Sequence, residues 1–250
     1  MPIEPTAAAA GIYDAATALL APRLSDRDRA DPEDLAARVN EAVSATGSFA
    51  DRWATVRTAP ATTRALADDL LTLHLLFPRD VSISRKVSLL GTSPGPELRA
   101  ALAAGVAPGG TAFQLRRLSQ LGYLARAVAA ARAGSATAVL SDPIRCRAWL
   151  HAVAPHGGHS QREALAHLLH PAAFEPIAVP AVKQRLREAL VPDAPTDTDD
   201  DAALTVARDR TGHPAERSLL ELAPRALTPP RATIGDDDTG GASPGARTSG

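Results

Sequence analysis

Apolar residues recur every three or four positions through most of the first 190 residues, which is the spacing of one face of an α-helix. In residues 62–77, for example, Leu66, Leu70, Leu73 and Phe77 share one face. The alternation of apolar and polar residues that marks β-strands does not run through any long segment, although short extended pieces near 174–179 remain an alternative. The pattern therefore predicts an all-α, multi-helix globular domain.

Turn and capping residues divide this pattern into successive helices. Asp31 followed by Pro32 is a typical helix start, and Gly47 and Pro78 mark helix ends. The longest apolar stripe follows the glycine-rich loop at 105–110, and we expect one continuous helix there. The expected helices span 12–24, 32–45, 49–57, 62–77, 82–90, 96–104, 111–133, 143 to the break near Pro155, 160–169, 182–190 and 201–209.

The composition changes after residue 190. Residues 1–190 carry 21 basic and 17 acidic side chains, whereas residues 191–250 carry 6 basic and 11 acidic ones. The later part is rich in proline, glycine and aspartate, which is typical of linkers and disorder. We expect an N-terminal helical segment (1–60), a helical domain (61–190), a linker with short helices (191–225) and a disordered acidic tail (226–250).

Three features of the sequence indicate the cellular compartment of the protein. The N-terminus has Glu4 and Asp14 in place of a basic leader, and no apolar run reaches the ~18 residues of a membrane span. The single cysteine, Cys146, excludes an intramolecular disulfide and is typical of a small buried hydrophobic side chain. We expect a cytoplasmic protein without membrane contact.

Two segments match catalytic or nucleotide-binding motifs only in part. Residues 91–95 fit the G-x-S-x-G pattern of serine hydrolases, but Pro94 has no N–H to stabilise an oxyanion and a predicted helix precedes the motif. The glycines at 105, 109 and 110 are not followed by the lysine of a P-loop. We predict loops at both places, with no catalytic residues and no nucleotide cofactor.

Five histidines lie within twenty residues, at positions 151, 156, 159, 167 and 170. His167 and His170 have the i, i+3 spacing that can place two imidazoles on one metal ion, yet no cysteine or acidic residue completes a familiar ligand set. We expect solvated or helix-capping histidines and no metal. An enzyme would require this cluster to meet Asp142 or Glu163 in a pocket, which remains an alternative.

Several short segments of residues 65–190 occur in the order found in one family. They are LHLLFP (73–78) with residues 82–90, GVAPGGTAF (105–113), QL (120–121), DPIRCRAWL (142–150), QREALAHLLHP (161–171), FEPI (174–177) and KQRLREAL (183–190). Together they resemble the N-terminal region of McrB-like AAA ATPases. Residues 116–119 depart from the family's Arg-Arg-Pro-Phe, and the family's AAA module does not follow in this sequence, so the ATPase activity is not carried over.

The resemblance implies a non-enzymatic recognition or accessory module of a restriction system, with DNA, an AAA motor or a nuclease subunit as partner. Residues 99–187 hold eleven basic and three acidic side chains, which suits phosphate contacts. An Arg-rich solvated surface, a protein–protein scaffold and a truncated product of an AAA ATPase gene are the alternatives. The candidate phosphate-positioning residues are Arg116, Arg117, Arg126, Lys183, Arg185 and Arg187.

Overall fold

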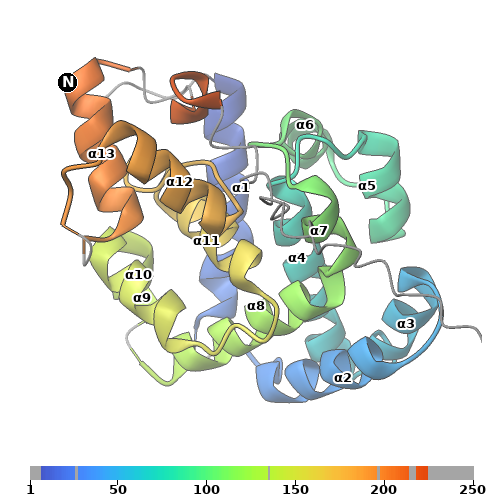
Figure 1. Cartoon of the computed structure of the whole chain (residues 1–250). Coiled ribbons are helices and arrows are strands. Elements are labelled where there is room, and N and C mark those ends of the chain that lie inside the picture. The colour runs from blue at the N-terminus through green and yellow to red at the C-terminus, as the bar shows by residue number, and fades with distance from the viewer. Residues whose placement is uncertain (1–6, 26–27, 135, 196–197, 214–217, 225–250) are drawn as a thin grey trace, which may run out of the picture.

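The computed structural model describes residues 7–25, 28–134, 136–195, 198–213 and 218–224. These residues form thirteen α-helices and one short 3₁₀ helix (Figure 1). Their β-structure is limited to one isolated bridge between Pro78 and Ala107. The predicted all-α fold is therefore confirmed, while the predicted disordered tail (226–250) lies outside the described residues.

Most of the expected helices are present within a few residues of their predicted bounds. The loop expected at residues 91–95 also forms, between the end of one helix and the start of the next. The helices are α1 (Ala7–Arg23), α2 (Pro32–Ser44), α3 (Phe49–Val56), α4 (Ala61–Leu76), α5 (Ile83–Leu90), α6 (Pro96–Ala104), α7 (Gly110–Leu115), α8 (Arg117–Arg132), α9 (Ala136–Ser141), α10 (Pro143–Ala152), α11 (His159–Leu169), α12 (Pro180–Leu190), α13 (Asp200–Thr211) and η1 (Leu219–Glu221).

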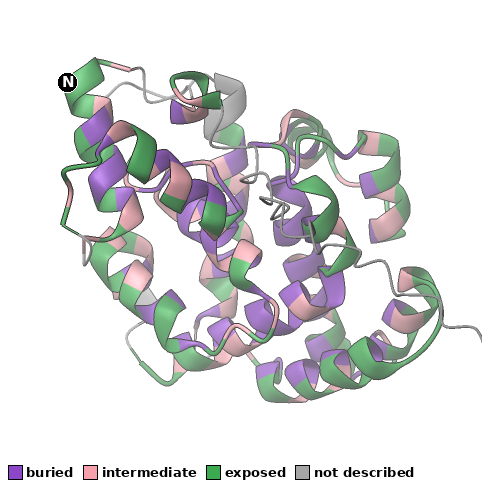
Figure 2. Ribbon diagram, viewed as in Figure 1, coloured by how far each residue is buried: buried purple, intermediate pink, exposed green. Residues whose placement is uncertain are grey.

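Two helices, α4 and α8, form the centre of the molecule. Ten of the sixteen residues of α4 and eleven of the sixteen residues of α8 are buried, and the burial extends around both helices (Figure 2). A helix that is buried around most of its circumference needs neighbouring elements on most of its sides. Accordingly, α8 packs against α2, α4, α10 and α11, while α4 packs against α1.

The buried apolar side chains form two clusters. The larger one runs from Ile12 to Ala178 and includes residues on both sides of residue 60, where we predicted a domain boundary. The smaller one joins α12, α13 and η1 through Leu186, Leu204 and Leu219. The domain boundaries themselves remain a prediction. None of the described helices has the length and apolar character needed to cross a membrane.

The prediction of one continuous helix over residues 111–133 is wrong in one respect, because the helix is interrupted at Arg116. This residue has φ −93° and ψ 22°, which separates α7 from α8. The Asp80 carboxylate accepts hydrogen bonds from the backbone N–H groups of Gly109 and Gly110, at 2.9 and 3.1 Å. Phe113 stacks on His74 with 4.6 Å between ring centroids. These tertiary contacts fix the direction of α7, and α8 begins as a separate helix.

Two details lay outside the sequence prediction. The six-residue helix α9, which begins at Ala136, was not expected. Residues 174–179, where extended pieces were an alternative, form neither a strand nor a helix. Their buried side chains belong to both apolar clusters, Phe174 to the larger one and Ile177 to the smaller one.

Candidate functional site

Three basic side chains of the second half of the chain are neutralised by buried carboxylates. The Lys183 ammonium is 2.7 Å from a carboxylate oxygen of Glu163 and 2.8 Å from one of Asp201, and its side chain is 2% exposed. Arg147 pairs with Asp201 at 3.1 Å, and Arg162 pairs with Glu163 at 3.0 Å. We call these five residues the ion-pair cluster; they join α10, α11, α12 and α13.

Mutual attraction keeps this cluster charged. Burial alone would lower the pKa of Lys183, but the carboxylates of Asp201 and Glu163 outweigh it, so that pKa is raised. Burial would likewise raise the pKa of Glu163, but the charge and hydrogen bond of Lys183 outweigh it, so that pKa is lowered. A cavity of about 80 Å³ beside the cluster is too small for a drug-sized ligand. The cluster therefore holds helices together.

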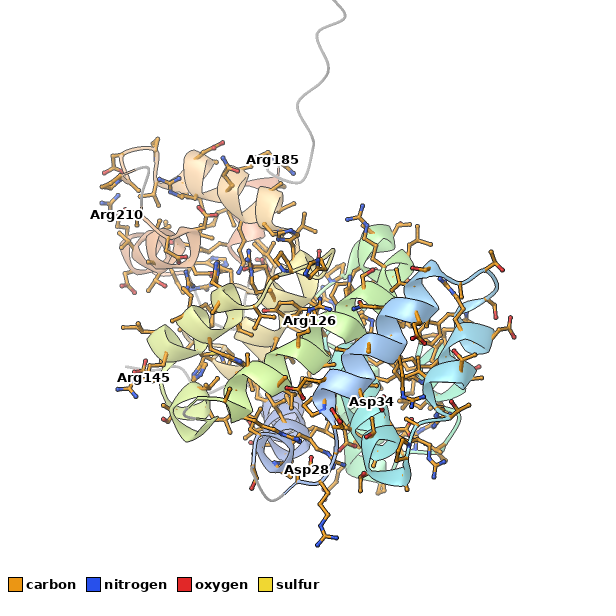
Figure 3. All side chains as sticks on the ribbon, turned by 90° about the horizontal axis from the view of Figure 1, so that it is seen from below. Asp28, Asp34, Arg126, Arg145, Arg185 and Arg210 are labelled. Atoms are coloured by element: carbon orange, nitrogen blue, oxygen red, sulfur yellow. The ribbon has the colours of Figure 1, made fainter. Side chains whose placement is uncertain are left out.

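Lys183 thus does not fit its predicted role as a phosphate contact. The helical periodicity of α12 turns Lys183 inward together with Val182 and Leu186. On the same helix, a guanidinium nitrogen of Arg187 donates to the carbonyl oxygens of Ala194 and Pro195, at 3.2 and 2.6 Å. Arg185, labelled in Figure 3, is partly exposed on α12.

The five clustered histidines do not converge. His167 is held between the hydroxyl of Tyr13 at 3.1 Å and the carbonyl oxygen of Phe174 at 2.6 Å. His170 instead hydrogen-bonds the carbonyl oxygen of Val139 at 3.0 Å, so the i, i+3 pair does not share a ligand. Within the described residues, no three His, Cys, Asp or Glu side chains are placed to hold a metal ion.

The enzyme alternative required the histidine cluster to meet Asp142 or Glu163 in a pocket, and the structure places His151 and Glu163 on one cavity. His151 lines the small cavity of the ion-pair cluster. None of the described residues lining that cavity is a serine, threonine or cysteine that could act as a nucleophile. Cys146 is fully buried, as expected, and burial raises its pKa to about 12, so the thiol stays protonated.

A second group of basic residues has no carboxylate partner. This arginine patch consists of Arg85 on α5, Arg116 between α7 and α8, and Arg117, the first residue of α8. Arg85 and Arg116 are exposed, and no carboxylate of the described residues lies within 4.0 Å of any of the three. In addition, no side chain caps the N-terminus of α8, whose dipole favours an anion there.

Arg117 is the residue that distinguishes this patch from an ordinary solvated surface. Arg117 is only 8% exposed, and its guanidinium lies 4.7 Å from the ring centroid of Phe49. The buried Nε of Arg117 has no hydrogen-bond partner. Burial lowers the pKa of Arg117, and the positive charge of Arg85 lowers it further. A buried cation beside a second cation is a costly arrangement unless an anion neutralises it.

A further cation lies close to the patch. Lys86 is fully buried on α5, and its ammonium donates to the carbonyl oxygen of Leu102 at 2.6 Å. Burial lowers the pKa of Lys86 to about 8. The charges of Arg117 and Lys86 both disfavour protonation of the His74 imidazole, which places all three near one another. Positive charge therefore accumulates between α4, α5 and α8, and the carboxylate that acts on Lys86 is that of the exposed Asp80.

The remaining candidate, Arg126, lies between α2 and α8, as Figure 3 shows. Of the six candidates, the structure thus places Arg116 and Arg117 together and separates Arg126 and the three α12 residues from them. Arg85 and Phe49 were missed by the sequence analysis. The exposed face of α5 is visible in the sequence, but its proximity to a residue 32 positions later is not.

The comparisons with known proteins leave the function to be argued from this geometry. No protein-family model, no curated protein and no solved structure matches the chain.

Proposed function

We propose that this chain is a non-catalytic helical recognition module that binds DNA phosphates through the arginine patch. The observation that carries the proposal is Arg117, a mostly buried guanidinium with an unpartnered Nε and a neighbouring arginine in place of a carboxylate. The ordered resemblance of residues 65–190 to the N-terminal region of McrB-like AAA ATPases supports the same class. DNA is the partner that we propose for the patch, and an AAA motor or nuclease subunit would act on the bound DNA.

The chemistry of the patch suits a phosphodiester. A guanidinium presents parallel N–H donors that match two phosphate oxygens, and the contact with Phe49 orients the Arg117 plane. The exposed Arg116 precedes Arg117 in the chain and the charge of the exposed Arg85 acts on it, so both add positive charge to the patch. Such contacts fix position on the duplex without reading its sequence. We therefore expect affinity that depends strongly on salt and weakly on base sequence.

The test is binding of the full chain to labelled duplex DNA, methylated and unmethylated, over a series of salt concentrations. Each phosphate contact contributes about 0.9 to the slope of log affinity against log salt. The triple variant Arg85→Ala, Arg116→Ala, Arg117→Ala should lose at least about tenfold in affinity, and the slope should become shallower by about 2 to 3.

A matched control removes three arginines elsewhere. Arg64 is exposed on α4, Arg145 is paired with Asp142, and Arg210 is paired with Asp193. The triple variant Arg64→Ala, Arg145→Ala, Arg210→Ala changes the net charge equally and should retain binding. Equal losses of DNA affinity in the two triple variants would show that binding depends only on the overall charge of the chain. No binding at the lowest salt would refute the proposal.

A protein–protein scaffold is the second candidate, and two exposed apolar side chains favour it. Leu115 at the end of α7 and Ile144 on α10 are 78% and 79% exposed. Single exposed apolar residues are common on protein surfaces, so this observation is weaker than the one for Arg117. If the chain binds no DNA, Leu115→Ser and Ile144→Ser should weaken its association with an AAA or nuclease subunit, measured by co-purification of the two defined proteins.

A further inference from the structure

We infer that a groove between α2 and α8 is a binding pocket for a phosphate group of a small molecule. This groove is separate from the arginine patch and does not depend on DNA binding. It contains a cavity of about 340 Å³ that is partly open to solvent, and this volume lies in the range of small-molecule sites. Its lining residues are Asn40, Val43, Ser44, Ser119, Arg126 and His156.

The chemistry of the lining favours an anion. One guanidinium, one imidazole, one amide and two hydroxyl groups can all donate hydrogen bonds, and none of the six described lining residues carries a carboxylate. A metal cation would find no negative ligand here, whereas the oxygens of a phosphate group would find a donor on each wall. Val43, which is 40% exposed, supplies an apolar side against which a sugar or base can lie.

Arg126 is held at the groove without a charge partner. Burial lowers the pKa of its guanidinium, its buried Nε has no hydrogen-bond partner, and an Nη donates to the carbonyl oxygen of Pro155 at the limiting distance of 3.5 Å. Gly122, one turn earlier on α8, leaves the space that this guanidinium uses. A Cβ at Gly122 would lie 3.4 Å from an Arg126 Nη and 3.3 Å from a methyl of Val39 on α2.

His156 reaches the groove from a strained turn after α10. Among the residues that the structure describes, it is the one non-glycine residue with a positive φ, 41°. The turn is closed by a hydrogen bond of 2.6 Å from the N–H of Gly158 to the carbonyl oxygen of Pro155. A glycine or asparagine would adopt this conformation at lower cost. The strained position therefore places an imidazole where the fold alone would favour a glycine.

The ligand is defined by its phosphate group, which either inorganic phosphate or a nucleoside monophosphate supplies. Isothermal titration calorimetry of the full chain at constant ionic strength, with each of these probes against chloride alone, should show saturable binding at one site. Tighter binding of the nucleotide would identify a site that also holds the sugar or base. Equal affinities would identify free phosphate, and absence of saturable binding of both would overturn the inference.

Two variants separate binding from folding. Arg126→Gln removes the charge but keeps a hydrogen-bonding side chain, and it should weaken phosphate binding by about tenfold or more. His156→Gly removes the imidazole but relieves the backbone, so it should weaken binding while the melting temperature stays equal or rises. If Arg126→Gln fails to fold, the phosphate affinity of His156→Gly alone tests the inference.

The controls separate this site from the arginine patch. Arg145→Gln changes an exposed arginine elsewhere and should leave phosphate affinity unchanged. The triple arginine-patch variant should also retain phosphate binding, even if it loses DNA binding or if the wild type binds no DNA. Unchanged phosphate affinity in both Arg126→Gln and His156→Gly would refute this pocket.

Discussion

Acidification from pH 7 to pH 5 should destabilise this fold strongly, because two histidines are buried in their neutral form. His74 is 1% exposed and its Nδ1 lies 2.7 Å from the amide oxygen of Gln161; His167 is 4% exposed between Tyr13 and Phe174. Burial lowers the pKa of His74 to about 3 and that of His167 to about 4. Neither imidazole can take up a proton at pH 5 without losing its folded environment.

The sign and size follow from the difference between the folded and unfolded states. In the unfolded chain both histidines titrate near 6.5, so below this pH the unfolded state binds protons that the folded state does not. The stability is fully present above pH 6.5 and is lost as the pH falls toward the folded pKa values. Each histidine contributes about 1.4 kcal/mol per pH unit, so the two together remove about 4 kcal/mol between pH 6.5 and 5.

Urea titrations followed by circular dichroism at pH 7, 6 and 5 measure this loss. His167→Gln should lower the free energy of unfolding at pH 7, because the hydrogen bonds to Tyr13 and Phe174 change, but it should also remove about half of the pH dependence. The exposed His159 provides the control, since His159→Asn should keep the full dependence. A free energy of unfolding that is the same at pH 7 and pH 5 would refute the reasoning.

Two substitutions probe the interior further. Lys183→Met should lower the free energy of unfolding in urea by about 3 to 5 kcal/mol, since Glu163 and Asp201 would lose their buried partner; a loss below about 1 kcal/mol would contradict this. Gly105→Ala should cost about 1 to 3 kcal/mol, because φ is 58° and the new Cβ would lie 2.7 Å from a backbone atom. Gly11→Ala has open space and should be neutral or stabilising in the same assay, so equal losses would argue against this steric explanation.

The helices could be predicted because their causes are local. The spacing of Leu66, Leu70 and Leu73 creates an apolar face wherever the segment lies, and Asp31 caps the helix that follows it by accepting from the N–H of Asp34 at 2.8 Å. The break at Arg116 could not be predicted in the same way. It depends on Asp80, which lies about thirty positions away in sequence from the glycines that it binds.

The candidate site shows the same division more sharply. The sequence by itself determined that the chain is helical, that residues 99–187 are basic and that Arg116 and Arg117 belong to this basic segment. It could not distinguish Lys183 from Arg117. Only the tertiary structure places two carboxylates against Lys183 and none against Arg117, and the role of a charged group depends on the charges within a few ångströms of it.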